Sequence, residues 1–193
     1  MKKVEEVIIQ VALRIAKRGD GALFVVGNHL EYSPLVEQNV PPFNILENPK
    51  LLESLALMDG AVIIDSKGFM KAYGVMIKTK KTFKNFGTRH SAGITAAQGK
   101  NIVYLVSEED RKIRIMKNQK IVMQIDPFQK DVEKNVSAIS EWLESLGAGT
   151  LGSVGTAILV PTLGLTFIPG VIIFGSAYYI SKMLASSFMK NRR

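Results

Sequence analysis

Three short stretches of this chain carry residue types that bind phosphate groups and divalent metal ions. Asp59-Gly60-Ala61 sets a carboxylate and a flexible glycine directly before an apolar run. Gly87-Thr88-Arg89-His90-Ser91-Ala92 joins hydroxyl, guanidinium and imidazole groups at a predicted helix start, where backbone N–H groups and the helix dipole favour an anion. Ser107-Glu108-Glu109 follows another apolar run and offers carboxylates to Mg²⁺ or Mn²⁺ near phosphates.

Each stretch, taken alone, also has an ordinary structural interpretation. The first is a turn acid before a strand, and a second copy of it, Asp20-Gly21-Ala22, occurs earlier in the chain. The second is a helix capped by Thr88, with a solvated Arg89 and a packed His90. The third is a polar turn between strands. The case for chemistry therefore depends on the order of the three stretches and on the elements around them.

The composition removes several classes of chemistry. The 193 residues include no cysteine, which excludes disulfides, cysteine-based zinc sites and thiol catalysis. They include only two histidines. A content of 47% hydrophobic and 22% charged residues is typical of a globular protein. Acidic residues within the first apolar run argue against a signal peptide, so we expect a cytoplasmic domain.

Hydrophobic periodicity predicts helices and strands in a mixed order. Helical spacing and capping signals predict helices over 2–18, 49–58, 88–98 and 128–146. Short apolar runs predict strands over 22–26, 61–65, 70–77, 102–106, 112–116 and 120–125. Prolines favour a loop over 28–48. These elements predict an α/β fold with a mixed central β-sheet flanked by helices.

Residues 78–87 form a predicted loop that carries four lysines. The loop is either simply solvated or attracts a polyphosphate or an anionic lipid surface. Its basic face is too narrow to predict nucleic-acid binding, and we expect no nucleic-acid partner.

The charge of the chain changes abruptly near residue 145. All 17 acidic residues precede it, and residues 145–181 carry no charge, whereas the last twelve residues hold four basic side chains. Prolines and glycines between 161 and 170 favour an apolar helical hairpin with limbs at 148–160 and 171–184. A single membrane crossing over 163–184 and a buried hairpin of a soluble protein are the alternatives.

The chain therefore divides into three predicted parts. Residues 1–19 form an N-terminal amphipathic helix, residues 20–145 an α/β domain, and residues 146–193 a membrane-associated hairpin with a basic tail. The basic tail is expected on the cytoplasmic side. We expect attachment to the cell membrane, with the folded domain facing the cytoplasm.

In this context the three stretches resemble the diadenylate cyclase family, whose members make cyclic di-AMP. The family pattern is a helix leading into a DGA strand, a β-hairpin, a G-T-R-H motif that opens a helix, and a strand that ends in Ser-Glu-Glu. Residues 51–61, 62–77, 87–90 and 106–109 match it in that order, and the resemblance covers about residues 20–125. Asp59 matches the family aspartate, because it follows the 49–58 helix; Asp20 lies too far upstream.

The resemblance implies a reaction and a set of site residues. Two ATP molecules would bind to a homodimer packed face to face, with Mn²⁺ or Mg²⁺, and each 3′-hydroxyl would attack the α-phosphate of the other nucleotide. Catalytic roles would fall to Asp59, Arg89 and His90, and metal binding to Asp59, His90 and Glu109. ATP binding would fall to Gly60, Ala61, Ile77, Thr88, Arg89, His90, Ser91, Ala92 and Ser107.

One residue departs from the family pattern, which commonly reads R-H-R where this chain has Arg89-His90-Ser91. The lost positive charge affects the expected catalytic rate more than nucleotide binding. Diadenylate cyclase activity is the leading prediction. The alternatives are a non-catalytic sensor of ATP or cyclic di-AMP at the membrane, and a membrane-associated interaction protein that uses the basic loop and the apolar tail.

Overall fold

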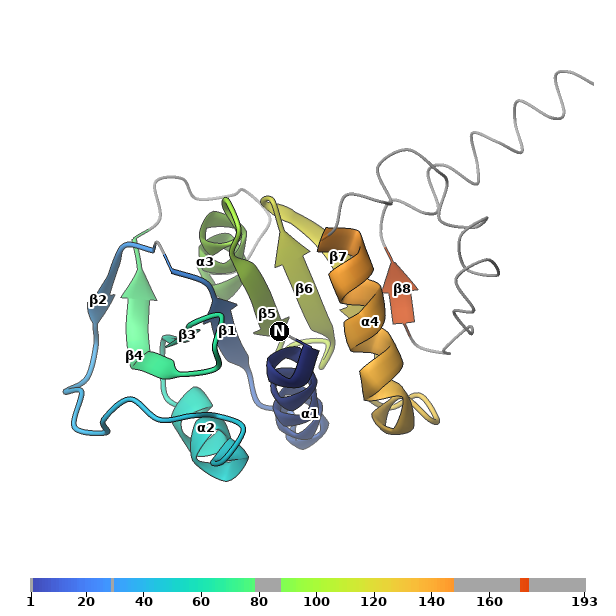
Figure 1. The fold of residues 1–193 in the computed structure, drawn as a ribbon, viewed down its shortest axis with the longest axis horizontal. Helices are drawn as coiled ribbons and strands as arrows, with labels where there is room; N and C mark the ends of the chain where they lie inside the picture. The colour runs from blue at the N-terminus through green and yellow to red at the C-terminus, as the bar shows by residue number, and fades with distance from the viewer. Residues whose placement is uncertain (1, 29, 79–87, 148–170, 174–193) are drawn as a thin grey trace, which may run out of the picture.

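A mixed eight-stranded sheet forms the centre of the molecule in a computed structural model that describes residues 2–28, 30–78, 88–147 and 171–173 (Figure 1). The helices are α1 (Lys2–Arg18), α2 (Pro49–Ala56), α3 (Thr88–Ala96) and α4 (Val136–Gly147), preceded by the short 3₁₀ helix η1 (Glu133–Asn135). The strands are β1 (Ala22–Val26), β2 (Tyr32–Pro34), β3 (Ala61–Ile64), β4 (Met70–Ile77), β5 (Ile102–Val106), β6 (Ile113–Lys117), β7 (Lys120–Ile125) and β8 (Val171–Ile173).

The strand order β2-β4-β3-β1-β5-β6-β7-β8 places β1 and β5 in the middle of the sheet. β1 pairs in parallel with β3, and the other neighbouring strands pair antiparallel. Both β1 and β5 are buried along their whole length. This burial explains their continuous apolar sequences, because a strand covered on both faces has no solvent side to make polar.

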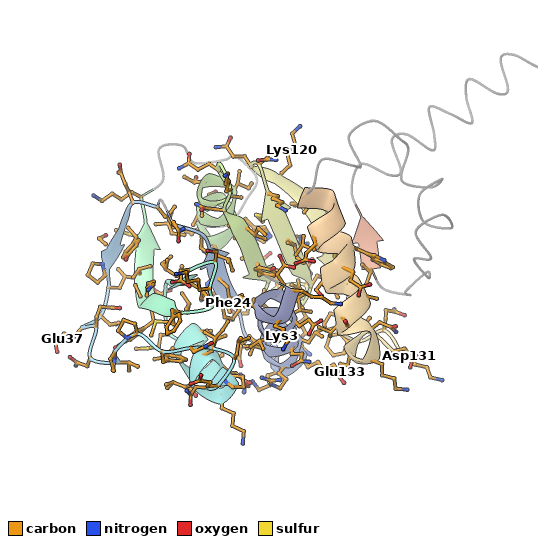
Figure 2. All side chains as sticks on the ribbon, in the orientation of Figure 1. Lys3, Phe24, Glu37, Lys120, Asp131 and Glu133 are labelled. Carbon is orange, nitrogen blue, oxygen red and sulfur yellow. The ribbon has the colours of Figure 1, made fainter. Side chains whose placement is uncertain are left out.

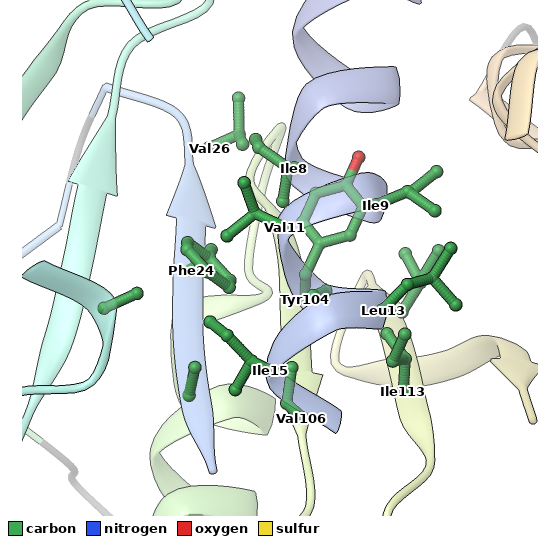
Figure 3. Packing of buried hydrophobic residues seen from close by; sticks show 14 of the residues in the cluster. Ile8, Ile9, Val11, Leu13, Ile15, Phe24, Val26, Tyr104, Val106 and Ile113 are labelled. Carbon is green, nitrogen blue, oxygen red and sulfur yellow. The ribbon is translucent and has the colours of Figure 1, made fainter. Parts of the chain in front are cut away.

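Helices cover both faces of the sheet, and alternate residues of each central strand serve the two resulting cores. α1, α2 and α4 pack on one face, where Phe24 and Tyr104 lie among apolar residues of α1 (Figure 3). α3 packs on the other face, against Leu23 and Leu105 among others. Figure 2 shows Phe24 near the centre of the molecule, whereas the labelled Glu37, Lys120 and Asp131 lie toward its outside.

The predicted fold class is confirmed for the described residues, with three local corrections. Residues 32–34, predicted as loop, form strand β2 on the outer side of β4. Pro34 is tolerated there because an edge strand does not need every N–H for the sheet. Strands 61–65 and 112–116 shift by one residue at their ends, and the 49–58 and 88–98 helices end at Ala56 and Ala96.

The second correction concerns the helix predicted over 128–146. Residues 128–132 are not helical; η1 and then α4 begin only after Asp131, which has a positive φ of 70°. A residue in the left-handed conformation cannot continue a right-handed helix, so the helix begins later than the apolar spacing of this segment predicts.

The third correction concerns the C-terminal segment. Residues 171–173 pair with β7 as strand β8, so a helical limb beginning at residue 171 is wrong for these three residues. The limb predicted over 148–160 and the remainder of the second limb lie outside the described residues. Within the parts of the chain that the structure describes, no helix is both long and apolar enough to cross a membrane.

Candidate active site

The three candidate stretches meet at one end of the central strands β3, β1 and β5. Phe24 is in register with Val62 of β3, and Ala22 is in register with Val106 of β5. The start of β1 therefore lies between the start of β3, which follows Asp59, and the end of β5, which precedes Ser107. α3, which carries the G-T-R-H residues from Thr88 onward, packs on β1 and β5, contacts β4 and β6 as well, and adds the third side.

Two pockets open at this end of the strands, and Asp59, Thr88 and Arg89 line both of them. The polar pocket has a volume of about 790 Å³ and the apolar pocket about 430 Å³. Every residue predicted for catalysis, nucleotide binding or metal binding lines one of the two. The polar pocket is lined by Asp59, Thr88, Arg89, His90, Leu105, Val106, Ser107, Glu108 and Glu109. The apolar pocket is lined by Leu23, Leu35, Asp59, Gly60, Ala61, Val75, Met76, Ile77, Thr88, Arg89, Ser91 and Ala92.

Arg89 lies where the two pockets join. Its guanidinium Nη1 donates to the carboxylate of Glu108 over 3.3 Å, and both side chains are exposed. An exposed pair of this kind contributes little to stability, so Arg89 can exchange Glu108 for a phosphate at small cost. Glu108 is thus a partner of the phosphate-binding candidate.

His90 is half-buried and faces the polar pocket. Burial lowers the pKa of His90 below its usual value, and the charge of Arg114 lowers it further, against the opposing effect of Asp110 and Glu109. The imidazole is therefore neutral at pH 7, the form that can bind a metal ion or accept a hydrogen bond.

Asp110 fixes the loop that follows β5. Its burial alone would raise its pKa, but hydrogen bonds from Arg114, Ser107 and the Lys112 backbone lower the pKa to about 2. The Arg114 guanidinium contacts both carboxylate oxygens. The Asp110 carboxylate, held by Arg114, accepts the hydrogen bond of Ser107, which lines the polar pocket.

Ser91, which stands where the family pattern has arginine, lies on a different side of α3 from His90. It is only 5% exposed and lines the apolar pocket beside Ala92. Ser91 therefore belongs to the wall of the apolar pocket, whereas His90 and Glu109 line the polar one.

Gly60 is required by the backbone around it. Its φ is +101°, and a Cβ there would lie 2.7 Å from the Val75 backbone nitrogen on β4. The N–H of Gly60 donates to the Asp59 carboxylate over 2.9 Å. Gly60 thus lets the turn pass close to β4, and its N–H binds one of the two Asp59 carboxylate oxygens.

The donor set fits a metal ion that arrives with a phosphorylated ligand. Among the described residues, no three His, Cys, Asp or Glu side chains lie close enough together to hold a metal ion. Asp59, His90 and Glu109 nevertheless line the same pocket. Mg²⁺ is commonly held by one or two carboxylates together with substrate phosphates, which this arrangement allows.

The sequence predicted Ala61, Ile77 and Ala92, which line the apolar pocket, but it missed the other apolar residues of the two pockets. Leu23, Val75, Leu105 and Val106 are strand residues whose pattern signals burial and nothing more. Leu35 follows β2, in a region predicted as loop, and no sequence signal places it at the site.

Two curated relatives are named diadenylate cyclase. One, from Haloferax volcanii, is 29% identical over 139 residues, covering 62% of this chain and 51% of that protein. The other, from Methanocaldococcus jannaschii, is 29% identical over 145 residues, covering 65% of this chain and 46% of that protein. The chain thus spans about half the length of these curated relatives.

The fold is shared with a solved structure. The crystal structure of a double mutant of DacA from Staphylococcus aureus matches with a TM-score of 0.50 and 20% identity, covering 73% of this chain and 93% of that chain. The sequence model of the family described as "DAC: DisA bacterial checkpoint controller nucleotide-binding" matches residues 10–121, more than half of the chain. The chain therefore belongs to the diadenylate cyclase (DAC) family.

Proposed function

We propose that this chain is a diadenylate cyclase that condenses two ATP molecules into cyclic di-AMP and two pyrophosphates. The observation that carries the proposal is the meeting of all three motifs around two pockets that share Asp59, Thr88 and Arg89. Membership of the DAC family supports it.

In the proposed reaction, the 3′-oxygen of each ATP forms a bond to the α-phosphorus of the other nucleotide. The bond between that phosphorus and the bridging oxygen breaks, and pyrophosphate leaves with the electron pair. Asp59 accepts a hydrogen bond from the attacking 3′-hydroxyl and takes its proton, because one of its oxygens is free of the Gly60 N–H.

Phosphate groups would bind at the start of α3. The first N–H groups of this nine-residue helix and the Thr88 hydroxyl are donors, and Arg89 supplies the positive charge. Holding the phosphates there orients the α-phosphorus, and such positioning accounts for much of the catalysis of phosphoryl-type transfer.

A divalent ion, Mg²⁺ or Mn²⁺, would neutralise phosphate charge when bound. Asp59, His90 and Glu109 are the candidate ligands, since all three line the polar pocket, and one or two of them would hold it together with substrate phosphates. Neutral His90 and ionised carboxylates are the forms that bind metal ions.

The proposed active site needs two copies of the chain. Leu35 and Met76 border the apolar pocket and are 48% and 54% exposed, an unusual position for large apolar side chains in a monomer. A second copy packed face to face would cover them and bring the two nucleotides together.

Product formation tests the proposal. The full chain is incubated with ATP and either Mn²⁺ or Mg²⁺, and cyclic di-AMP is detected by mass. We expect product from the unchanged chain and a loss of about 100-fold or more in Asp59→Asn, because general-base removal typically costs that much. Asp20→Asn is the matched control, since Asp20 begins the other DGA stretch but pairs with Arg18, and it should keep full activity.

The alternative is a sensor that binds ATP or cyclic di-AMP without turnover. Ser91 favours the sensor. It stands where the family pattern has arginine, and its nearly buried hydroxyl brings no positive charge to the phosphates. A folded chain that binds ATP but forms no cyclic di-AMP with either metal ion would establish the sensor and contradict the cyclase.

We also propose that residues 146–193 attach the protein to the cell membrane, with the α/β domain on the cytoplasmic side. The long uncharged segment and the basic end support this proposal.

A further inference from the structure

The turn between α1 and β1, residues 19–21, brings Gly21 next to the side chain of Arg89. The register of the central strands places the start of β1 between the DGA turn and the end of β5. This turn begins with Gly19, whose φ of +88° ends α1. Arg18, the last residue of α1, pairs with Glu53 of α2 and also lies 3.3 Å from Asp20, an exposed pair that contributes little to stability.

Gly21 has no room for a side chain, and the space that a side chain would need is filled by Arg89. A Cβ on Gly21 would lie 2.3 Å from the Arg89 Nη1 and 3.3 Å from its Cζ. It would also lie 3.4 Å from the Cβ of Glu108. Gly21 does not have a positive φ, so backbone conformation does not explain why a glycine stands at this position.

We propose that Gly21 is a positioning residue that seats the Arg89 guanidinium at the junction of the two pockets. The bare backbone at residue 21 forms the floor under the guanidinium, and Glu108 holds it from the side. A methyl group at this position would lift Arg89 away from Glu108 and from the phosphate it is proposed to bind. The second DGA stretch therefore belongs to the site through its glycine, although its aspartate does not.

The first test measures nucleotide affinity in the full chain, and it rests on the proposed function. The probe is 3′-deoxy-ATP with Mg²⁺, which lacks the attacking hydroxyl and so cannot condense. We expect Gly21→Ala to weaken its binding about tenfold, the size of one lost charge-assisted hydrogen bond. In the Arg89→Ala background, Gly21→Ala should cause no further loss, because its effect acts through Arg89. Equal losses in both backgrounds would overturn the proposal.

The second test does not depend on nucleotide binding. The side-chain Nε–Hε resonance of Arg89 is assigned by its loss in Arg89→Ala, and it should shift in Gly21→Ala. Gly93→Ala is the matched control, because that glycine also lies in contact with a flexible side chain, Met116, and lines neither pocket. An unmoved Arg89 resonance in Gly21→Ala overturns the proposal.

The two tests separate the possible failures. If the unchanged chain binds no 3′-deoxy-ATP, the proposed function fails, while the Arg89 resonance still decides the role of Gly21. Thermal unfolding identifies a variant that fails to fold, and the double variant, which lacks the clashing guanidinium, then supplies the comparison.

Discussion

Gly60 is the residue at which backbone geometry and site chemistry are most closely joined. Its positive φ and its contact with the β4 backbone allow the turn to place Asp59 at the mouth of both pockets. The DGA motif therefore needs its glycine for the path of the chain, whereas the family resemblance implied only ATP binding for Gly60.

We expect Gly60→Ala to lower the free energy of unfolding by more than Gly99→Ala. Both glycines have positive φ, but a Cβ at Gly99 meets nothing within 4 Å, so that variant reports the conformational cost alone, about 1 kcal/mol. Gly60→Ala adds a collision with backbone atoms that cannot rotate away. Urea unfolding of both variants measures the difference, and equal losses would contradict the argument.

At the scale of elements, α1 joins the sheet through a core that contains one buried acid. Glu5 is 1% exposed, and neither carboxylate oxygen has a hydrogen-bond partner among the described residues. Burial raises the pKa of Glu5 to about 7, and Glu144 of α4 and Glu6 add to the effect, whereas Lys117 of β6 and the N-terminus oppose it. The hydroxyl of Tyr104 on β5 is buried nearby, and burial also raises its pKa.

Because of Glu5, we expect the free energy of unfolding to fall as the pH rises from about 4.5 to about 7. Between these values the folded chain keeps the Glu5 proton and the unfolded chain has lost it, so each rise in pH favours unfolding. The total is on the order of 3 kcal/mol. Urea unfolding across this pH range should show the decline in the unchanged chain and in Glu47→Gln, an exposed control. The decline should disappear in Glu5→Gln, and its persistence there would contradict the assignment.

The elements that sequence could predict are those whose apolar pattern is local. β1, β5 and α1 have such patterns, and their bounds are as predicted. β2 and β8 could not be predicted, because three-residue edge strands depend on a neighbour that is distant in sequence. The family resemblance predicted the polar residues of the site and three apolar ones, Ala61, Ile77 and Ala92. The remaining apolar residues depend on the order of the strands, which no local pattern predicts.

At the scale of the whole molecule, β8 connects the C-terminal region to the α/β domain. It pairs with β7 through Met123, Gln124 and Ile125, and Val171 packs against the main core. The region that follows residue 145 thus contributes to the sheet as well as carrying the proposed membrane attachment.

A chain that ends at residue 145 should therefore change in two respects. It should no longer float with phospholipid vesicles, because the uncharged segment and the basic end are gone. It should also unfold at lower urea concentration, because β7 becomes an unpaired edge. Vesicle flotation and urea unfolding, each compared with the full chain, measure the two effects. Flotation of the shortened chain would contradict the membrane proposal.

The central position of β1 has a consequence for biosynthesis. β1 is synthesised well before its partner β5, which begins 76 residues after the end of β1, at residue 102, and ends at residue 106. Closing so long a stretch of chain is slow, and β1 stays without half of its sheet contacts until then. The cleft around Arg89 has no floor on the β5 side before this pairing, so a nascent chain cannot bind nucleotide there. Ligand can therefore stabilise only a chain in which β5 has already been made and paired.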